Sequence, residues 1–280
     1  MLSFSIGPFA LSMAHVVLLI ALTLATLVGW IAGRKRRVNP EKAIFGLFLL
    51  GLLVARLSFV ALYWAQYRDN VLGIVDIRDG GFLSWPGVAA AVLSAALYGW
   101  KHPALRMPLG YGTGVGLAFW LLATIGINQQ AHAERLPDLS VRNAAGESVR
   151  LSDYQGKKLV INLWATWCPP CRREMPVLQT AQQANDDVVF LFVNQAETPG
   201  TVATFLAAQG LHLDNLLFDS RGQLGQQVGS AALPTTLFYT PDGGLLTAHL
   251  GELSAASLQH TLDRLSSASP LPSSLSRSAQ

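Results

Sequence analysis

Long apolar runs, interrupted by short polar segments, dominate the first 128 residues of the chain. Four of these runs approach the roughly 20 residues that a helix needs to cross the hydrocarbon core of a bilayer. The pattern therefore predicts an all-α transmembrane bundle of about four helices in residues 1–128. The expected spans are 11–32, 43–64, 82–100 (or 85–100) and 108–127.

The pattern changes after residue 128, where apolar runs of strand length alternate with amphipathic stretches of helical length. Buried parallel strands that alternate with helices, followed by an antiparallel hairpin and a last helix, indicate an α/β domain in residues 136–266. Residues 129–135 are expected to be a linker, and the Ser- and Pro-rich residues 267–280 a disordered tail. The predicted strands are 140–142, 149–151, 159–165, 188–194, 216–218, 236–240 and 245–250, and the predicted helices are 169–184, 200–209, 222–228 and 254–266.

Charge is sparse and unevenly distributed along the first half. Only 13% of the residues are charged and 51% are hydrophobic, so the basic pI of about 9.0 comes mainly from the loops 34–42 and 101–106. Lys and Arg collect in cytoplasmic loops. We therefore expect a multi-pass protein of the cytoplasmic (inner) membrane, with its N-terminus and the α/β domain on the periplasmic, extracytoplasmic side. Basic residues confined to such loops do not support nucleic-acid binding.

Cys168 and Cys171 are the only cysteines in the chain, and they directly follow the predicted strand 159–165. If the next helix begins near Pro169, its unpaired N–H groups and positive dipole end favour a thiolate at Cys168, the attacking sulfur. Cys171, one helical turn further on, is the resolving sulfur. Pro169 and Pro170 suit a first helical turn, where their missing N–H groups would have no partner. The spacing predicts a redox-active disulfide between the two cysteines.

Two other uses of this cysteine pair agree less well with the sequence. A zinc site needs four ligands, and outside the pair His212, His249 and His260 are scattered singly. A static structural disulfide that closes such a short loop constrains the unfolded chain only weakly. We therefore expect no metal and no other cofactor.

Three segments of the second half resemble the membrane-tethered, TlpA/ResA-like branch of the thioredoxin superfamily. They are L-P-D-L-S-V-R-N-A-A-G-E-S-V-R-L-S-D-Y-Q-G-K at 136–157, W-A-T-W-C-P-P-C-R-R-E-M-P at 164–176 and A-L-P-T-T-L-F at 232–238. The resemblance implies a thioredoxin fold and thiol–disulfide exchange with periplasmic protein thiols and disulfides. It also implies a cis Leu233–Pro234 bond that faces the dithiol. The implied substrate groove consists of Trp167, Pro169, Pro170, Leu233 and Pro234.

The same resemblance bears on the proton acceptor of the resolving thiol. Ordinary thioredoxins carry a buried Asp six residues before the first cysteine, where this chain has Asn162, and an amide cannot accept that proton. TlpA/ResA-like proteins share a Glu three residues after the second cysteine, which is Glu174 here. On a helix, Glu174 lies on the same face as Cys171 and is the candidate base. The alternative is a solvated carboxylate that only complements the helix dipole.

The first half carries a second resemblance, to the first spans of prolipoprotein diacylglyceryl transferase, over about residues 4–125. It rests on F-S-I-G-P-F-A-L at 4–11, A-R-L-S-F-V-A-L-Y-W at 55–64 and I-R-D-G-G-F-L-S-W-P-G-V at 77–88. This chain departs from the family at the motifs that carry its chemistry. Where the family has W-Y-G-L this chain has M-A-H-V, at 13–16, and where the family has the H-G-G of S-F-H-G-G this chain has W-P-G, at 85–87. The later arginine-bearing spans of the family are missing. Without an imidazole base and an arginine clamp, we expect an inactive relative that anchors the chain among membrane lipids.

Arg56 is the exception in this apolar half, because a charge inside a membrane span is costly and is usually functional or paired. The side chain either holds a lipid headgroup or snorkels to the outer surface. Its depth in the predicted helix favours snorkelling.

Together these features predict a membrane-anchored protein-disulfide reductase. The first half has no cysteine, so electrons have to reach Cys168 and Cys171 from a separate donor. The resemblance implies a transmembrane donor of the thiol–disulfide reductase type. Three alternatives stay open: a disulfide-donating oxidase of the same fold, a lipid-binding or lipoprotein-modifying membrane protein with a thioredoxin accessory, and a non-enzymatic scaffold.

Overall fold

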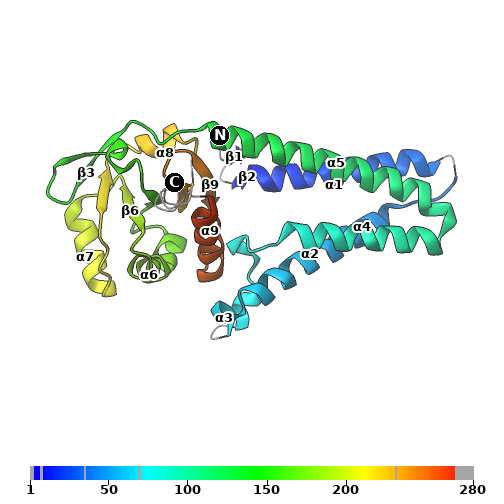
Figure 1. Ribbon diagram of the computed structural model, residues 1–280, viewed down its shortest axis with the longest axis horizontal. Helices are drawn as coiled ribbons and strands as arrows, with labels where there is room; N and C mark the ends of the chain where they lie inside the picture. Colours follow the sequence, from blue (N-terminus) through cyan, green and yellow to red (C-terminus); the bar gives the residue numbers. More distant parts are fainter. Residues whose placement is uncertain (1–2, 7–8, 35, 69–70, 231, 269–280) are drawn as a thin grey trace, which may run out of the picture. The chain divides into compact units, whose positions relative to one another are not determined.

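The structure, a computed structural model of the chain, describes residues 3–6, 9–34, 36–68, 71–230 and 232–268 (Figure 1). The chain divides into a helical unit, residues 11–129, and a second unit that comprises residues 1–10 and 130–280. Near the N-terminus, β1 (Ser3–Ile6) and β2 (Phe9–Ser12) form a two-stranded sheet. The sequence pattern did not predict this pair.

Helices make up most of the first unit, as the sequence predicts. Among the described residues, α1, α2 and α5 are long and apolar enough to cross a membrane. The third predicted span corresponds to α4, which has 18 residues and does not reach this standard, because it includes polar and small residues at its start and a lysine at its end. The elements are α1 (Met13–Arg34), α2 (Glu41–Leu62), α3 (Trp64–Tyr67), the 3-10 turns η1 (Val71–Ile74) and η2 (Ile77–Asp79), α4 (Ser84–Lys101) and α5 (Pro103–Ala133).

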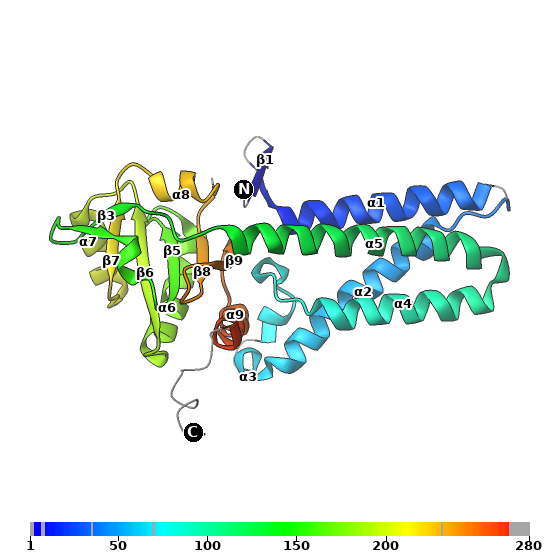
Figure 2. The same ribbon diagram turned by 45° about the horizontal axis from the view of Figure 1, so that its top comes forward.

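Glycines let these helices approach one another closely in pairs. A Cβ atom on Gly116 of α5 would lie 2.8 Å from the Cβ of Ala25 in α1, and one on Gly87 of α4 would lie 2.5 Å from the carbonyl oxygen of Gly51 in α2. The pairs α1/α5 and α2/α4 accordingly run side by side in both ribbon views (Figures 1 and 2). Small residues at helix contacts are typical of packing in a membrane, where apolar burial between helices gives no driving force.

Arg56 of α2 is buried against the segment that precedes α4, with 5% of its surface exposed. Its guanidinium pairs with Asp79, at 2.9 Å between Nη1 and Oδ1. Its remaining four N–H groups donate to the backbone carbonyls of Gly73, Ile74, Asp76 and Gly81. Because a guanidinium has five N–H donors, none is left for a lipid phosphate. Both predictions for Arg56 are therefore wrong: the residue fastens residues 73–81 to α2.

Replacing Arg56 with Leu is expected to lower the free energy of unfolding of the helical unit by about 3–5 kcal/mol, because Asp79 would keep a buried charge without its cation. Arg78→Leu is the matched control, since Arg78 pairs with Asp76 at an exposed site where an ion pair contributes about 0–1 kcal/mol. Thermal unfolding of the full chain in detergent compares the two variants. Equal melting temperatures for Arg56→Leu and Arg78→Leu would contradict a stabilising role of the buried pair.

In the described part of the second unit, seven strands form one sheet in the order β4-β3-β7-β6-β5-β8-β9. The central strands β5, β6 and β7 are parallel, and the other neighbours are antiparallel. The strands are β3 (Ser140–Asn143), β4 (Ser148–Arg150), β5 (Lys158–Trp164), β6 (Val188–Gln195), β7 (Leu216–Asp219), β8 (Thr235–Tyr239) and β9 (Leu245–Leu250). The helices are α6 (Pro169–Ala184), α7 (Pro199–Gln209), α8 (Gln223–Gln227) and α9 (Ala255–Ala268), with the 3-10 turn η3 (Leu151–Tyr154) after β4.

The sheet separates two apolar layers, and β5 contributes to both. Val160 and Trp164 belong to the layer that also contains both cysteines and residues of α6, α7 and α9. Ile161 and Leu163 belong to the opposite layer, to which α8 contributes. Successive side chains of a strand point to opposite faces, so Asn162 lies on the same face as Val160 and Trp164. The predicted α/β fold is confirmed, and it places this polar residue beneath α6.

The boundaries of the second unit differ from those expected from the sequence. Helix α5 continues to Ala133, so most of the predicted linker 129–135 is helical. The residues that follow pair with the turn before β9: the N–H of Leu245 donates to the carbonyl of Glu134 at 3.0 Å, and the N–H of Leu136 donates to that of Gly243 at 2.9 Å. Except for its first two residues, which belong to α9, the tail predicted at 267–280 lies outside the described residues.

Candidate dithiol active site

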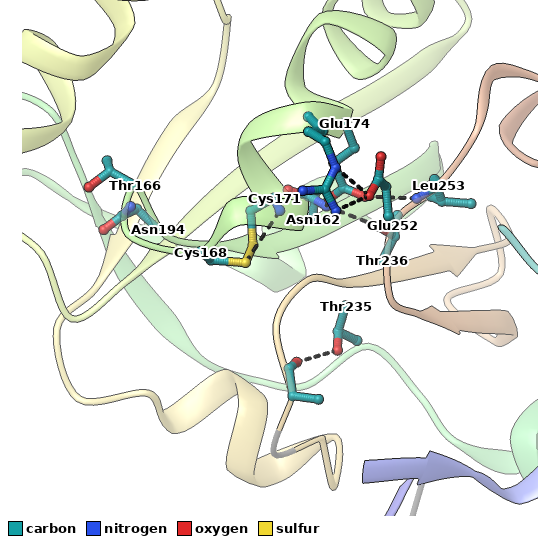
Figure 3. Close-up of a disulfide and its surroundings, with 12 residues drawn as sticks. Asn162, Thr166, Cys168, Cys171, Glu174, Asn194, Thr235, Thr236, Glu252 and Leu253 are labelled. Atoms are coloured by element: carbon teal, nitrogen blue, oxygen red, sulfur yellow. Dashed lines mark hydrogen bonds and ion pairs between the residues drawn. A yellow bond between two sulfur atoms is a disulfide. The ribbon is translucent and has the colours of Figure 1, made fainter. Parts of the chain in front are cut away.

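The two cysteines lie where the chain leaves β5 and enters α6 (Figure 3). They form a disulfide with an S–S distance of 2.06 Å. The backbone N–H of Cys171 donates to Sγ of Cys168 at 3.3 Å. Cys168 keeps 3% of its surface exposed and Cys171 none, so Cys168 is the more accessible of the two.

The local sequence explains why α6 begins at this point. Cys168 is the N-cap residue, and its side chain accepts a hydrogen bond from the first turn, as N-cap side chains do. Pro169 and Pro170 occupy the next two positions, where a helix needs no N–H donor. Once the disulfide is reduced, the positive end of the helix dipole therefore acts on the sulfur of Cys168 and favours its thiolate form.

Glu174 lies one turn after Cys171 on α6 and has no exposed surface. Its Oε1 accepts a hydrogen bond from Nδ2 of Asn162 at 2.8 Å, and its Oε2 accepts the N–H of Leu253 at 3.0 Å. Burial raises the pKa of Glu174 to about 8, the two hydrogen bonds oppose this rise, and the nearby charge of Glu252 adds to it. The alternative of a solvated carboxylate is wrong, because α9 and the segment before it cover this side of α6.

The residues expected to form the substrate groove differ in exposure. Trp167 is 67% exposed, whereas Trp164 is buried in the sheet. The Leu233–Pro234 peptide bond is cis, as the resemblance implies. Leu233 is half-buried and packs against the apolar layer that contains the cysteines, and Pro234 is buried. An exposed aromatic ring thus adjoins the first cysteine in sequence, while the groove itself stays a prediction.

A carboxylate that the sequence analysis did not single out anchors the segment before Cys168. Oε2 of Glu197 accepts the backbone N–H of Thr166 and Nδ2 of Asn194, both at 2.7 Å, and its Oε1 accepts the hydroxyl of Thr166. Charge-assisted hydrogen bonds of this kind are roughly twice as strong as neutral ones. The sequence offered one indication of this role for Glu197, its position just after β6, because β6 is the parallel neighbour of β5.

A disulfide at the start of the helix that follows a central parallel strand, together with a cis-proline bond before the next antiparallel strand, defines a thioredoxin-fold thiol–disulfide oxidoreductase. The Redoxin family matches residues 131–260. The thioredoxin-like protein YneN of Bacillus subtilis is 29% identical over 143 residues, which are 50% of this chain and 81% of YneN. The thiol-disulfide oxidoreductase ResA of Geobacillus thermodenitrificans is 30% identical over 131 residues, 46% of this chain and 75% of ResA. This chain therefore belongs to the ResA-like family of thiol–disulfide oxidoreductases.

The helical half has a match of its own, since the prolipoprotein diacylglyceryl transferase family covers residues 1–127. Both resemblances noted in the sequence are thus confirmed, and the chain is a fusion of the two. Among solved structures, a putative thiol:disulfide interchange protein DsbE from Chlorobium tepidum is 27% identical with a TM-score of 0.43, over 48% of this chain and 94% of that one.

Proposed function

We propose that this chain is a membrane-anchored reductase of protein disulfides, working on periplasmic partners through Cys168 and Cys171. The observation that carries the proposal is the fully buried Glu174 one turn from the resolving cysteine, with a pKa of about 8. A carboxyl with such a pKa can accept the proton of a thiol near neutral pH. When Glu174 is ionised, its negative charge also disfavours a thiolate at the neighbouring cysteine. The reduced form of the cysteine pair is then less stable relative to the disulfide, so the dithiol is a better reductant.

The proposed reaction transfers two electrons to the partner. The Cys168 thiolate attacks one sulfur of the partner's disulfide, a mixed disulfide forms, and the other partner sulfur leaves as a thiolate that takes a proton from solvent. Glu174 then removes the proton from Cys171, whose thiolate attacks the sulfur of Cys168. The Cys168–Cys171 disulfide forms, the second partner sulfur leaves and is protonated, and the partner is fully reduced.

Each turnover leaves this chain oxidised, so the proposal requires a donor of two electrons. Cys168 and Cys171 are the only thiols of the chain, and none lies in the helical half. Thiol exchange therefore cannot carry electrons across the membrane within this protein. A separate transmembrane protein with its own reduced dithiol is the class of donor that fits.

The charge distribution supports an extracytoplasmic second unit. Arg34 ends α1, and Lys101 and Arg106 lie on either side of the junction between α4 and α5. Because basic residues collect on the cytoplasmic side, α5 would leave the cytoplasm and end outside it. Disulfides persist in that compartment, so oxidised partner proteins occur there.

For the helical half we propose the role of an anchor among membrane lipids without transferase activity. It lacks the imidazole and the later arginines of its relatives, as the sequence W-P-G at 85–87 illustrates. Arg56, the arginine of its second helix, already uses all its donors within the protein. Neither a general base nor a free anion clamp therefore supports lipid transfer.

The reduction potential of the full chain in detergent tests the direction of electron flow. We expect a value closer to that of thioredoxin, about −270 mV, than to that of the oxidase DsbA, about −120 mV. Equilibration with thiol redox buffers, followed by maleimide labelling of free thiols, measures it. A value near −120 mV would favour the oxidase. A membrane-impermeant maleimide applied to intact spheroplasts tests the proposed location of the second unit, because it can reach the reduced cysteines only if they lie outside the cytoplasm. Labelling of these cysteines only after lysis would contradict the extracytoplasmic location.

A further inference from the structure

Asn162 is a buried polar residue of β5, and within the described structure only the nitrogen of its side-chain amide forms hydrogen bonds. Its Nδ2 donates to Oε1 of Glu174 at 2.8 Å and to Oγ1 of Thr236 at 2.9 Å, so both amide hydrogens are occupied (Figure 3). Its Oδ1 has no exposed surface and no hydrogen-bond partner among the described residues. A buried acceptor without a partner costs about 1–3 kcal/mol in other proteins, so its presence here needs a reason.

The reason lies in the two forms of the carboxyl that Asn162 contacts. An ionised carboxylate only accepts hydrogen bonds, and the Asn162 N–H and the Leu253 N–H supply them. A protonated carboxylic acid carries one O–H donor and needs an acceptor. A half-turn of the Asn162 amide brings Oδ1 to that O–H and turns the Nδ2 hydrogens to the side where Oδ1 had no partner, so one end of the amide stays unpaired in either orientation. Thr236 tolerates the half-turn, because a hydroxyl can donate as well as accept.

We propose that Asn162 is a positioning residue for both protonation states of Glu174: its amide nitrogen holds the carboxylate, and its amide oxygen, after a half-turn, holds the acid. The inference deepens the proposed function and rests on the role of Glu174 as proton acceptor. In the ordinary thioredoxin arrangement a carboxyl occupies this strand position. Here the carboxyl comes from α6, and the strand contributes an amide that fits it before and after proton transfer.

The surroundings of Glu174 leave this task to Asn162. The other charged groups nearby are Glu252, which raises the pKa of Glu174, and Arg173, which is paired with Glu252. The same helix also carries Arg172, which lies over the ring of Phe205, and in the reduced protein it carries the thiol of Cys171. The backbone N–H of Leu253 favours only the ionised form, since it cannot accept. Of the two groups that form hydrogen bonds with Glu174 in the part of the chain that the structure describes, the Asn162 side chain and the Leu253 N–H, only the Asn162 amide can both donate and accept.

Infrared titration of the full chain in its disulfide form, in detergent, tests the inference directly. The carboxyl band of Glu174 is identified by its loss in Glu174→Gln. In Asn162→Leu, the pKa read from this band is expected to rise by about one unit, because the charge-assisted hydrogen bond that the carboxylate loses is roughly twice as strong as the neutral one that the acid loses. The band of the protonated acid is expected at higher frequency than in the unsubstituted chain, because its O–H has lost its acceptor.

Asn194→Leu is the matched control, since Asn194 is a second buried Asn of the sheet and bonds to Glu197 instead. This control is expected to leave the Glu174 band and its titration unchanged. An unshifted titration in Asn162→Leu, or an equal shift in both variants, would overturn the inference. If Asn162→Leu does not fold, Thr236→Val removes the hydroxyl that holds the amide. A smaller shift in the same direction supports the inference, and no shift overturns it.

The band titration does not depend on turnover of a partner protein. It can therefore succeed even if Glu174 proves not to be the base, an outcome that the rate profile of Glu174→Gln would reveal. Conversely, an active Glu174 whose titration ignores Asn162 would leave the proposed function intact and overturn this inference alone.

Discussion

Replacing Cys171 with Ser is expected to stop turnover after the first chemical step and to accumulate covalent complexes with partner proteins. The attacking sulfur, Cys168, is unchanged at the start of α6 and can still open a partner's disulfide. Without the second sulfur the mixed disulfide cannot be resolved, so disulfide reduction should fall by roughly a thousandfold or more, as when a reacting group is removed from an enzyme. Acid trapping and non-reducing gels would show the complexes, and mass spectrometry would identify Cys168 as the linked residue.

Cys168→Ser is the matched variant, with the same change three residues earlier. It keeps Cys171, which has no exposed surface and is the less accessible of the two. We therefore expect loss of turnover without accumulated complexes. Ser is also a good N-cap residue, so α6 should keep its start. Complexes in equal amounts from both variants would contradict the assignment of attacking and resolving sulfurs.

The features that sequence could predict are those set by local rules. Bilayer thickness fixes the length of an apolar span, which is why α1 and α2 lie within two residues of their predicted positions and α5 contains the span predicted for it. The start of α6 follows from two prolines after a potential N-cap. The extension of α5 to Ala133 was not predicted, because its last residues are polar and show no apolar period, although residues such as Gln and Ala favour helices.

The features that sequence could not predict depend on residues far apart in the chain. The state of Arg56 is set by carbonyls of residues 73–81, in an irregular segment whose path no periodicity reveals. The burial of Glu174 requires Asn162 from β5 and Leu253 from the segment before α9. The sequence could indicate that Glu174 lies beside Cys171, but a solvated and a buried carboxylate have the same spacing along a helix. Only the packed α9 layer distinguishes them.

Replacing Glu174 with Gln is expected to slow disulfide exchange by about a hundredfold near neutral pH, a typical effect of removing a general base. The variant should also lose the rise in rate through about pH 8 that ionisation of Glu174 produces in the unsubstituted chain. Stopped-flow kinetics of the reduced full chain with a disulfide peptide measures both. Glu197→Gln is the control, because Glu197 is a carboxylate of the same domain whose hydrogen bonds go to Thr166 and Asn194. An unchanged rate profile in Glu174→Gln would exclude Glu174 as the base.

The same substitution should change how stability depends on pH. The pKa of Glu174 is about 8 in the folded protein against 4.5 for an unperturbed Glu. Between these values the folded state holds a proton that the unfolded state has lost, so stability is fully present below the lower value and falls as pH rises through the upper one. The loss across this window is roughly 3–5 kcal/mol. Gln carries no titrating proton, so Glu174→Gln should lack this loss.

Urea unfolding of the second unit within the oxidised full chain, read by pulse proteolysis, measures the effect. The informative quantity is the change with pH of the difference between the two proteins, because all other titrating groups cancel in it. Like the protonated acid, Gln offers one donor and one carbonyl acceptor to Asn162 and Leu253, so the two proteins should be about equally stable at about pH 5. By about pH 9 the unsubstituted chain should be the less stable protein. A difference that stays constant between these limits would mean that Glu174 is ionised in the folded protein throughout, and that its burial does not prepare it to accept a proton.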